Sequence, residues 1–434
     1  MKSSEFTARR TQLMAEVGQG NIALIASAKV RTRNRDVDYT FRQDSDFYYL
    51  TGFNEPDAVA VFIPGREQGE YILFCKEYDE KKALWEGAHA GLEGATTDFS
   101  ADDAFPIDDL SDILPGLLEN KAKVFYPMGR DASFDHQLME WITHIRSQTR
   151  SGINAPGELV SLEHLVHEMR LIKSDAEIEL MRFAADISGN AHIRAMQQCK
   201  VGRYEYQIEA ELIHEFMENG LRHVAYPSIV AGGKNACVLH YVENKSVLND
   251  GDLLLIDAGA EYDHYAADIT RTFPVNGRFS AEQKALYQLV LDAQFAAIEE
   301  IKPNTPWNNA HDVSVDVLTS GLVDLGLLTG DVTQLIKDEA YKDFYMHRIG
   351  HWLGMDVHDV GDYKINDQWC VLEPGMVLTI EPGLYIPKNC LKVDKKWRGI
   401  GIRIEDDVLV TETGYEVLTQ AAPKTIAEIE ALMN

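Results

Sequence analysis

A segment rich in small and turn-forming residues, Ser151–Glu158, separates two parts of the sequence with different patterns. Before it, apolar runs at Ala58–Pro64 and Tyr71–Cys75 predict buried strands that alternate with helical patterns in an α/β arrangement. The chain of 434 residues is also longer than one hydrophobic core usually serves. We therefore predict an α/β domain at residues 1–172 and a second domain at residues 173–434.

The second part mixes long helices with paired strands. Apolar residues recur at helical spacing from Leu159 to Leu171, and Ser174 with Glu177 has the spacing of a capping box at a helix start. Further helical patterns follow at Tyr204–Asn219, Ser280–Ile301 and Ala310–Leu325. Strand patterns lie between them in pairs, which is typical of an antiparallel α+β domain.

The composition limits the classes of partner. Lysine and arginine total 41 against 69 acidic residues, and the net charge of −28 would repel nucleic acid and anionic membranes. The charged N-terminus precedes an apolar stretch too short for a secretory signal or a membrane span, so we expect a cytoplasmic protein. The five cysteines are scattered and form no C-x-x-C pair, which predicts reduced, buried thiols.

Two carboxylates interrupt apolar strand patterns in DLLLIDAGAEYDHYAADITRTF. Asp257 ends the first apolar run and Asp268 falls inside the second, so the two can face each other across a turn. A carboxylate beside apolar strand residues is costly unless it is paired, hydrogen-bonded or bound to metal. Turn chemistry or a surface strand is the alternative explanation of this pair.

Two more acidic residues lie at strand patterns nearer the C-terminus. GIGIRIEDDVLV alternates strictly, so Gly401, Arg403 and Glu405 share one face of the predicted strand. Gly401 would leave space for a ligand above that face, although an exposed ion pair gives the same pattern. Glu381 falls near the end of the short strand VLTIEPG, which Pro and Gly stop.

Three histidines, His347, His351 and His358, lie within twelve positions among glycines that disfavour a regular helix. A lone histidine is more often structural, but this group accompanies the acidic strands. The sequence thus offers a set of four carboxylates and one imidazole, which are Asp257, Asp268, His351, Glu381 and Glu405. Such a set suits Mn²⁺ better than a structural zinc site, and two divalent ions about 3.5 Å apart would share it and bind a bridging hydroxide. It predicts metal-assisted hydrolysis.

Five segments carry a resemblance to a known family: HYVEN at His240–Asn244, IDAGAEYDHYAADITRTFPVNGRF, HRIGHWLGMDVHDVG, LEPGMVLTIEPGLYI and GIGIRIEDDVLVT. In this order they resemble the proline-specific aminopeptidases of the pita-bread metallopeptidase group, which includes prolidase. Asn34–Pro56 is similar to that family's first domain. The resemblance implies an α/β N-terminal domain, a pita-bread catalytic domain, and cleavage of the bond between an N-terminal residue and a following proline.

The resemblance also implies metal ligands. Asp257 and Asp268 would hold one ion with Asp268 bridging, His351 and Glu381 would hold the other, and Glu405 would bridge both. The expected cofactors are two divalent ions per subunit, with manganese the family's expected ion, although Co²⁺ and Zn²⁺ suit the same ligands.

Further roles follow from the same resemblance. His240 and His358 would hydrogen-bond the substrate and stabilise the tetrahedral oxyanion, and His347 would line the proline pocket. Arg403 and Tyr385 would orient the bridging carboxylate and hydroxide, while Glu381 would relay a proton to the leaving nitrogen.

The expected partners are peptides with proline at the second position, and the expected assembly is a homotetramer or dimer. Trp85 in KKALWEG is a candidate for closing a neighbour's active site, with ordinary core packing as its alternative.

Three alternatives share this fold: prolidase, which cleaves only Xaa-Pro dipeptides, a non-catalytic binding protein, and a metal-independent creatinase-like hydrolase. The sequences of the segments RQDSDFYYLTGF and HWLGMDVHDVG favour the aminopeptidase over prolidase. Complete ligand and histidine sets disfavour the other two alternatives.

Overall fold

The computed structural model describes residues 1–433, which form two compact units, one from Met1 to Arg170 and one from Leu171 onward. The segment Ser151–Glu158 lies within the first unit, where it leads into a strand, and the units divide at the end of the next helix. Residues 159–161 are strand rather than helix, so the helical pattern predicted from Leu159 begins only at Glu163. No helix among the described residues is long and apolar enough to cross a membrane.

The first unit is built on a mixed six-stranded sheet in the order β6-β5-β4-β1-β7-β8. Its strands are β1 (Ile22–Ala26), β4 (Val59–Phe62), β5 (Tyr71–Cys75), β6 (Asp103–Pro106), β7 (Lys123–Tyr126) and β8 (Glu158–Ser161), and a separate hairpin comprises β2 (Thr32–Asn34) and β3 (Val37–Asp38). Strands β4 and β5 are buried along their whole length and β1 at its first four residues, as their continuous apolar runs predict.

The α-helices of this part of the chain are α1 (Ser3–Val17), α2 (Ser45–Thr51), α3 (Glu80–Glu86), α4 (Gly91–Thr97), α5 (Leu110–Leu118), α6 (Ala132–Ser147) and α7 (Glu163–Leu171). Leu114 of α5 and Leu138 of α6 pack into the core with the β1, β4, β5 and β7 strands. Trp85, near the end of α3, is 86% exposed, so its alternative as core residue is wrong.

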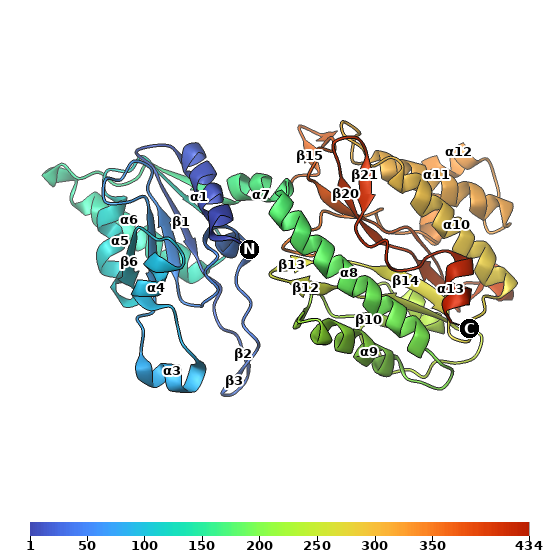
Figure 1. The fold of residues 1–434 in the computed structure, drawn as a ribbon. Helices are drawn as coiled ribbons and strands as arrows, with labels where there is room; N and C mark the ends of the chain where they lie inside the picture. Colours follow the sequence, from blue (N-terminus) through green and yellow to red (C-terminus); the bar gives the residue numbers. More distant parts are fainter. Residues whose placement is uncertain (434) are drawn as a thin grey trace. The chain divides into compact units, whose positions relative to one another are not determined.

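The second unit contains small antiparallel sheets and two packed helix pairs, α8 with α9 and α10 with α11 (Figure 1). Its helices are α8 (Asp175–Gln198), α9 (Glu205–Glu218), α10 (Ala281–Ile298), α11 (Asn309–Asp324), α12 (Val332–Lys337) and α13 (Ile426–Leu432). The capping box predicted at Ser174 and Glu177 is present at the start of α8. The three long helical patterns that follow it in the sequence are confirmed as α9, α10 and α11.

The strands of this unit pair antiparallel, as their pattern predicts. They are β9 (His223–Val224), β10 (Ile229–Gly232), β11 (Leu253–Asp257), β12 (Ala260–Tyr262), β13 (Tyr265–Ala266), β14 (Thr270–Pro274), β15 (Lys364–Ile365), β16 (Gln368–Trp369), β17 (Val377–Ile380), β18 (Gly383–Ile386), β19 (Ile400–Arg403), β20 (Asp406–Val410) and β21 (Tyr415–Val417). Strands β10, β11 and β14 form one sheet, while β17, β20 and β21 form another.

Asp268 and Gly401 have environments that differ from those predicted from the sequence. Asp268 lies two residues before β14 rather than inside a strand. Gly401 does not leave space for a ligand, because a Cβ there would meet the carbonyl oxygen of Ala236 at 2.4 Å. This glycine permits close backbone packing instead. All five cysteines are free, but only Cys75 and Cys199 are buried.

Candidate metal centre and substrate cavity

Strand pairing brings the first three carboxylates together. Asp257 is the last residue of β11 and pairs with Thr270 at the start of β14. Asp268 precedes Thr270 by two residues, so it lies near the same end of the strand pair as Asp257. Thr270 also forms a backbone bridge with Glu405, in the break between β19 and β20. Asp257, Asp268 and Glu405 are 9%, 5% and 2% exposed, which excludes a surface strand as the explanation of the pattern.

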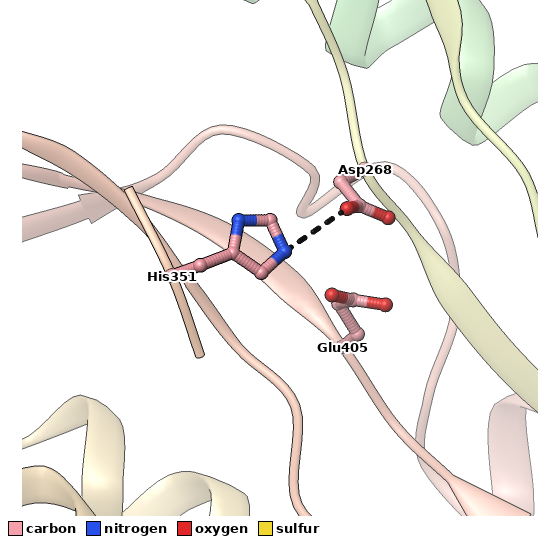
Figure 2. Close-up of side chains that lie close together, drawn as sticks. All are labelled: Asp268, His351 and Glu405. Atoms are coloured by element: carbon pink, nitrogen blue, oxygen red, sulfur yellow. Dashed lines mark ion pairs between the residues drawn. The ribbon is translucent and has the colours of Figure 1, made fainter. Parts of the chain in front are cut away.

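The remaining two predicted ligands are aligned by a second set of backbone contacts. The Glu381 amide donates to the Ile349 carbonyl at 2.7 Å, and Thr379 and His351 are linked through their backbones at 2.9 Å. The ring of His351 is fixed because Nδ1–H donates to the carbonyl of Trp352 at 2.9 Å. Its Nε2 therefore faces the carboxylates: it lies 3.4 Å from Asp268 Oδ2, as Figure 2 shows, and 3.8 Å from Glu381 Oε1.

These residues line a cavity of about 520 Å³. Ligand atoms of Asp268, His351 and Glu405 lie within 4.8 Å of one another, and Figure 2 shows the three side chains converging. Asp257 and Glu381 line the same cavity, as do His240, His347, His358 and Arg403. Of the predicted site residues, Tyr385 alone is not a lining residue; it lies behind His347 and Arg403.

The electrostatics of the cavity favour bound cations. Burial raises the pKa of Asp257 and of Glu405, and it raises the pKa of Glu381 to about 7, although the positive charges of His351 and Arg403 act the other way on Glu381. Burial lowers the pKa of His351, but its hydrogen bond with Asp268 and the charge of Glu381 outweigh burial and raise that pKa to about 9. Carboxylates that resist ionisation together are stabilised when divalent cations share them.

The donor set fits hard divalent ions. It provides carboxylate oxygens and one imidazole nitrogen, with no thiolate among the lining residues. Among the described residues, Oδ1 of Asp257 is buried and has no hydrogen-bond partner. A buried carboxylate oxygen of this kind is expected to have a ligand, and a metal ion at the cluster would provide it.

Arg403 links the cluster to a hydrogen-bonded chain behind the cavity. Its guanidinium donates to Asp257 Oδ2 at 2.5 Å, to Thr270 Oγ1 at 3.0 Å and to the Tyr385 hydroxyl at 3.1 Å. Thr270 in turn donates to Glu405 Oε2 at 2.6 Å. Arg403 is 4% exposed, so the alternative of an exposed ion pair is wrong.

The three remaining histidines have different environments. His240 is exposed on the loop after the short 3₁₀ helix Gly233–Cys237, while the ring of His358 lies edge-on to His351 at 4.4 Å. His347 Nδ1–H donates to the Arg348 carbonyl at 2.8 Å, so its Nε2 accepts from Tyr385 at 2.9 Å. Burial, with the charge of Arg403, lowers the pKa of His347 to about 3 and keeps the ring neutral.

Sequence reasoning missed Tyr226, which lines the cavity and donates from its hydroxyl to Asp268 Oδ1 at 2.5 Å. Burial and then the charges of Asp257 and Asp268 raise the pKa of Tyr226 well above its usual value, so it remains a donor. A single tyrosine before Pro227 gives no motif signal. Only the distance to Asp268, which lies 42 positions away, reveals it.

Each of the two units matches a known protein family. Residues 179–412 match the metallopeptidase family M24, and residues 6–126 match the N-terminal domain of aminopeptidase P. The chain is 45% identical to Xaa-Pro aminopeptidase of Haemophilus influenzae, over 100% of this chain and 98% of that protein. It is 44% identical to Xaa-Pro aminopeptidase of Escherichia coli, over 99% and 97%. The solved structure of Pseudomonas aeruginosa aminopeptidase PepP is 58% identical with a TM-score of 0.99, covering 100% and 98% of the two chains.

Proposed function

The chain belongs to the metallopeptidase family M24 and carries the N-terminal domain of aminopeptidase P, and on this premise we propose that it is an Xaa-Pro aminopeptidase. It hydrolyses the bond between an N-terminal residue and a following proline. Its second unit has the pita-bread fold of that family. The observation that carries the proposal is the convergence of Asp268, His351 and Glu405 at a buried point of the cavity.

We infer that two divalent ions per subunit are held by the five residues Asp257, Asp268, His351, Glu381 and Glu405. When bound, the ions supply Lewis acidity and lower the pKa of water toward neutrality. Manganese is the proposed physiological ion because the ligands are mostly carboxylates. Tyr226 and Thr270 hold Asp268 and Glu405 in orientation through their hydroxyl groups.

The chain's own residues also accommodate the substrate. We propose that the peptide's ammonium faces the carboxylates, and that imidazole donors of His240 and His358 stabilise the oxyanion that develops on the scissile carbonyl. We propose that Glu381 carries a proton toward the leaving nitrogen. Proline lacks an amide hydrogen and restricts the residue before it, so a cavity with apolar walls, such as those at Leu239 and Val357, can select its ring.

Hydrogen bonds link His347 to Tyr385 and Tyr385 to Arg403, and they refine the predicted role of His347. Both ring nitrogens of His347 are used within the protein, so we propose that it lines the cavity and orients Tyr385 without hydrogen-bonding the peptide. Arg403 donates hydrogen bonds to both Tyr385 and Asp257, so the position of Tyr385 also affects how Asp257 is held.

We further propose a cytoplasmic homotetramer or dimer in which exposed Trp85 contacts a neighbouring subunit. Light scattering on the wild type and on Trp85→Ala tests this, since loss of an 86% exposed side chain should reduce the assembled mass without unfolding the chain. An unchanged mass would exclude that contact.

The decisive experiment compares Ala-Pro-Ala with Ala-Pro as substrates of the metal-stripped protein, before and after addition of Mn²⁺, Co²⁺ or Zn²⁺. Tripeptide cleavage that returns with Mn²⁺ is expected. Cleavage of the dipeptide alone would identify a prolidase, and no cleavage with any ion would refute the proposed hydrolase.

A further inference from the structure

Arg348 is an exposed cationic side chain at the wall of the substrate cavity. It follows His347 and precedes the His351 ligand by three positions. Arg403 also lines this cavity, but it is committed to Asp257. Among the described residues, by contrast, no carboxylate lies within 4.0 Å of the Arg348 guanidinium, although the chain has 69 acidic residues. Arg348 is therefore a charge available to a ligand.

Aromatic residues hold this guanidinium in place. Its Cζ lies 4.9 Å from the centre of the Trp369 ring and 5.5 Å from that of Trp307, and the two rings stack on each other at 5.6 Å. One guanidinium nitrogen donates to the side-chain oxygen of Asn308. Stacking and one hydrogen bond restrict the side chain, which reduces the conformational entropy that ligand binding would otherwise cost.

The backbone explains why these residues meet. The Trp307 amide donates to the Cys370 carbonyl at 2.9 Å, and Pro306 forms a bridge with Val371. This pairing places Trp307 and Asn308, just before α11, beside Trp369 of β16. Arg348 is therefore supported by two segments that are distant in sequence and contain none of the proposed metal ligands.

The charges of the cavity have a polarity that matches a short peptide. The carboxylate cluster suits the peptide's ammonium, whereas Arg348 suits a carboxylate and repels an ammonium. We propose that Arg348 is a specificity-determining residue that binds a substrate carboxylate on the C-terminal side of proline. The carboxylate is either the free C-terminus of a short peptide or an acidic side chain after proline. This inference rests on the proposed function.

The experiment measures kcat and KM for Ala-Pro-Ala, its C-terminal amide, and Ala-Pro-Asp amide with the Mn²⁺-loaded protein. The wild type should cleave the free acid about fivefold more efficiently in kcat/KM than the amide, through KM, because a partly exposed charge pair contributes modestly. A matching preference for Ala-Pro-Asp amide over Ala-Pro-Ala amide would assign binding to the side-chain carboxylate. Arg348→Gln should reduce the preference to about one.

Lys364→Gln is the matched control, because Lys364 also lies over the Trp369 ring, at 4.3 Å, but does not line the cavity. It should keep the preference for carboxylate. Calorimetric binding of the dipeptide Pro-Leu and its amide gives a readout without turnover, and the same discrimination should vanish in Arg348→Gln.

The possible failures are distinct. Equal kcat/KM for all three peptides in the wild type, or a carboxylate preference that survives Arg348→Gln, would overturn the role of Arg348 while leaving the aminopeptidase intact. Failure of the wild type to cleave any of the three peptides would refute the proposed function and this inference together.

Discussion

Tyr226 shows how one side chain outside the ligand set can control a ligand's orientation. Its hydroxyl donates to Asp268, and a hydrogen bond to a charged acceptor contributes about 1.5 kcal/mol or more. We predict that Tyr226→Phe lowers kcat about tenfold, because Asp268 loses the donor that fixes one of its oxygens. Steady-state kinetics with Ala-Pro-Ala at saturating Mn²⁺ measures the effect.

Tyr265→Phe is the matched control for that prediction. The hydroxyl of Tyr265 is also buried and donates to a carboxylate, Glu177, at 2.7 Å, but Tyr265 does not line the cavity. It should lower thermal stability and leave kcat within about twofold. If Tyr226→Phe behaved in the same way, the hydroxyl would have only a structural role.

The residues that sequence could predict are those whose type conflicts with a local pattern. Asp257 ends an apolar run, so its cost of burial is visible in the sequence itself. Tyr226 and Arg348 conflict with nothing nearby. Their significance depends on Asp268 and on Trp307 and Trp369, which only the fold brings into contact.

Among the elements, the loop that carries His240 depends on the N-terminus of α9. Glu205, the first residue of that helix, is fully buried. Its carboxylate accepts four hydrogen bonds from residues on both sides of His240. The donors are the backbone amides of Gly232 and Ser246, the side-chain amide of Asn235 and the Tyr241 hydroxyl. One carboxylate therefore holds residues on both sides of His240, including its neighbour Tyr241.

We predict that Glu205→Ala raises KM for Ala-Pro-Ala several-fold and lowers the free energy of unfolding by about 2 kcal/mol, because buried donors lose their acceptor. Glu205→Gln should recover part of both losses, since its amide oxygen still accepts. Kinetics and urea unfolding measure the two effects. Glu211→Gln, on the same helix but paired with Arg194 and Arg203, is the control that should leave KM unchanged.

In the first unit, Asp46 links α2 to α7 and to the turn before α6. It pairs with Arg170 at 2.6 Å, Arg130 at 2.6 Å and His167 at 3.2 Å, and it is 2% exposed. Burial alone would raise the pKa of Asp46, but the hydrogen bond with His167 and the two arginine charges hold it well below its usual value. Because the folded pKa is depressed, its stabilisation is present above the unfolded pKa of about 3.9 and is lost as pH falls further.

We therefore predict that Asp46→Asn lowers the free energy of unfolding at pH 7 by about 3 kcal/mol, since the buried Arg170 loses its ion pair with Asp46. The difference from the wild type should shrink as pH falls from 4 toward 2. Thermal unfolding across this pH range measures it. A constant difference at all pH values would show that packing, and not charge, accounts for the loss.

Element positions were predictable where pattern and local geometry agree. The capping box fixed the start of α8, and the helical periods located α9, α10 and α11. Asp268 was misplaced inside a strand because the apolar run AADITRTF does not show where pairing begins. Gly401 was misread because an absent side chain fits an open site and a close backbone contact equally well. Only the position of Ala236 distinguishes them.

At the scale of the whole molecule, the two units have separate cores and differ in how their buried carboxylates are compensated. The first unit balances Asp46 with its own arginines, whereas the second concentrates four carboxylates around one cavity. Metal ions should therefore stabilise the second unit selectively. An ion present at one hundred times its dissociation constant adds about 2.7 kcal/mol to the free energy of unfolding.

We predict two unfolding transitions in calorimetry. A chelator should lower the midpoint temperature of one of them, and added Mn²⁺ should restore it. Asp46→Asn should lower the other transition, so the variant assigns each transition to its unit without truncating the chain. A chelator that moves neither transition would contradict a metal site among the five ligands. If chelator and Asp46→Asn both lowered one common transition, the units would unfold together, and the metal's stabilisation would then extend to the first unit through that coupling.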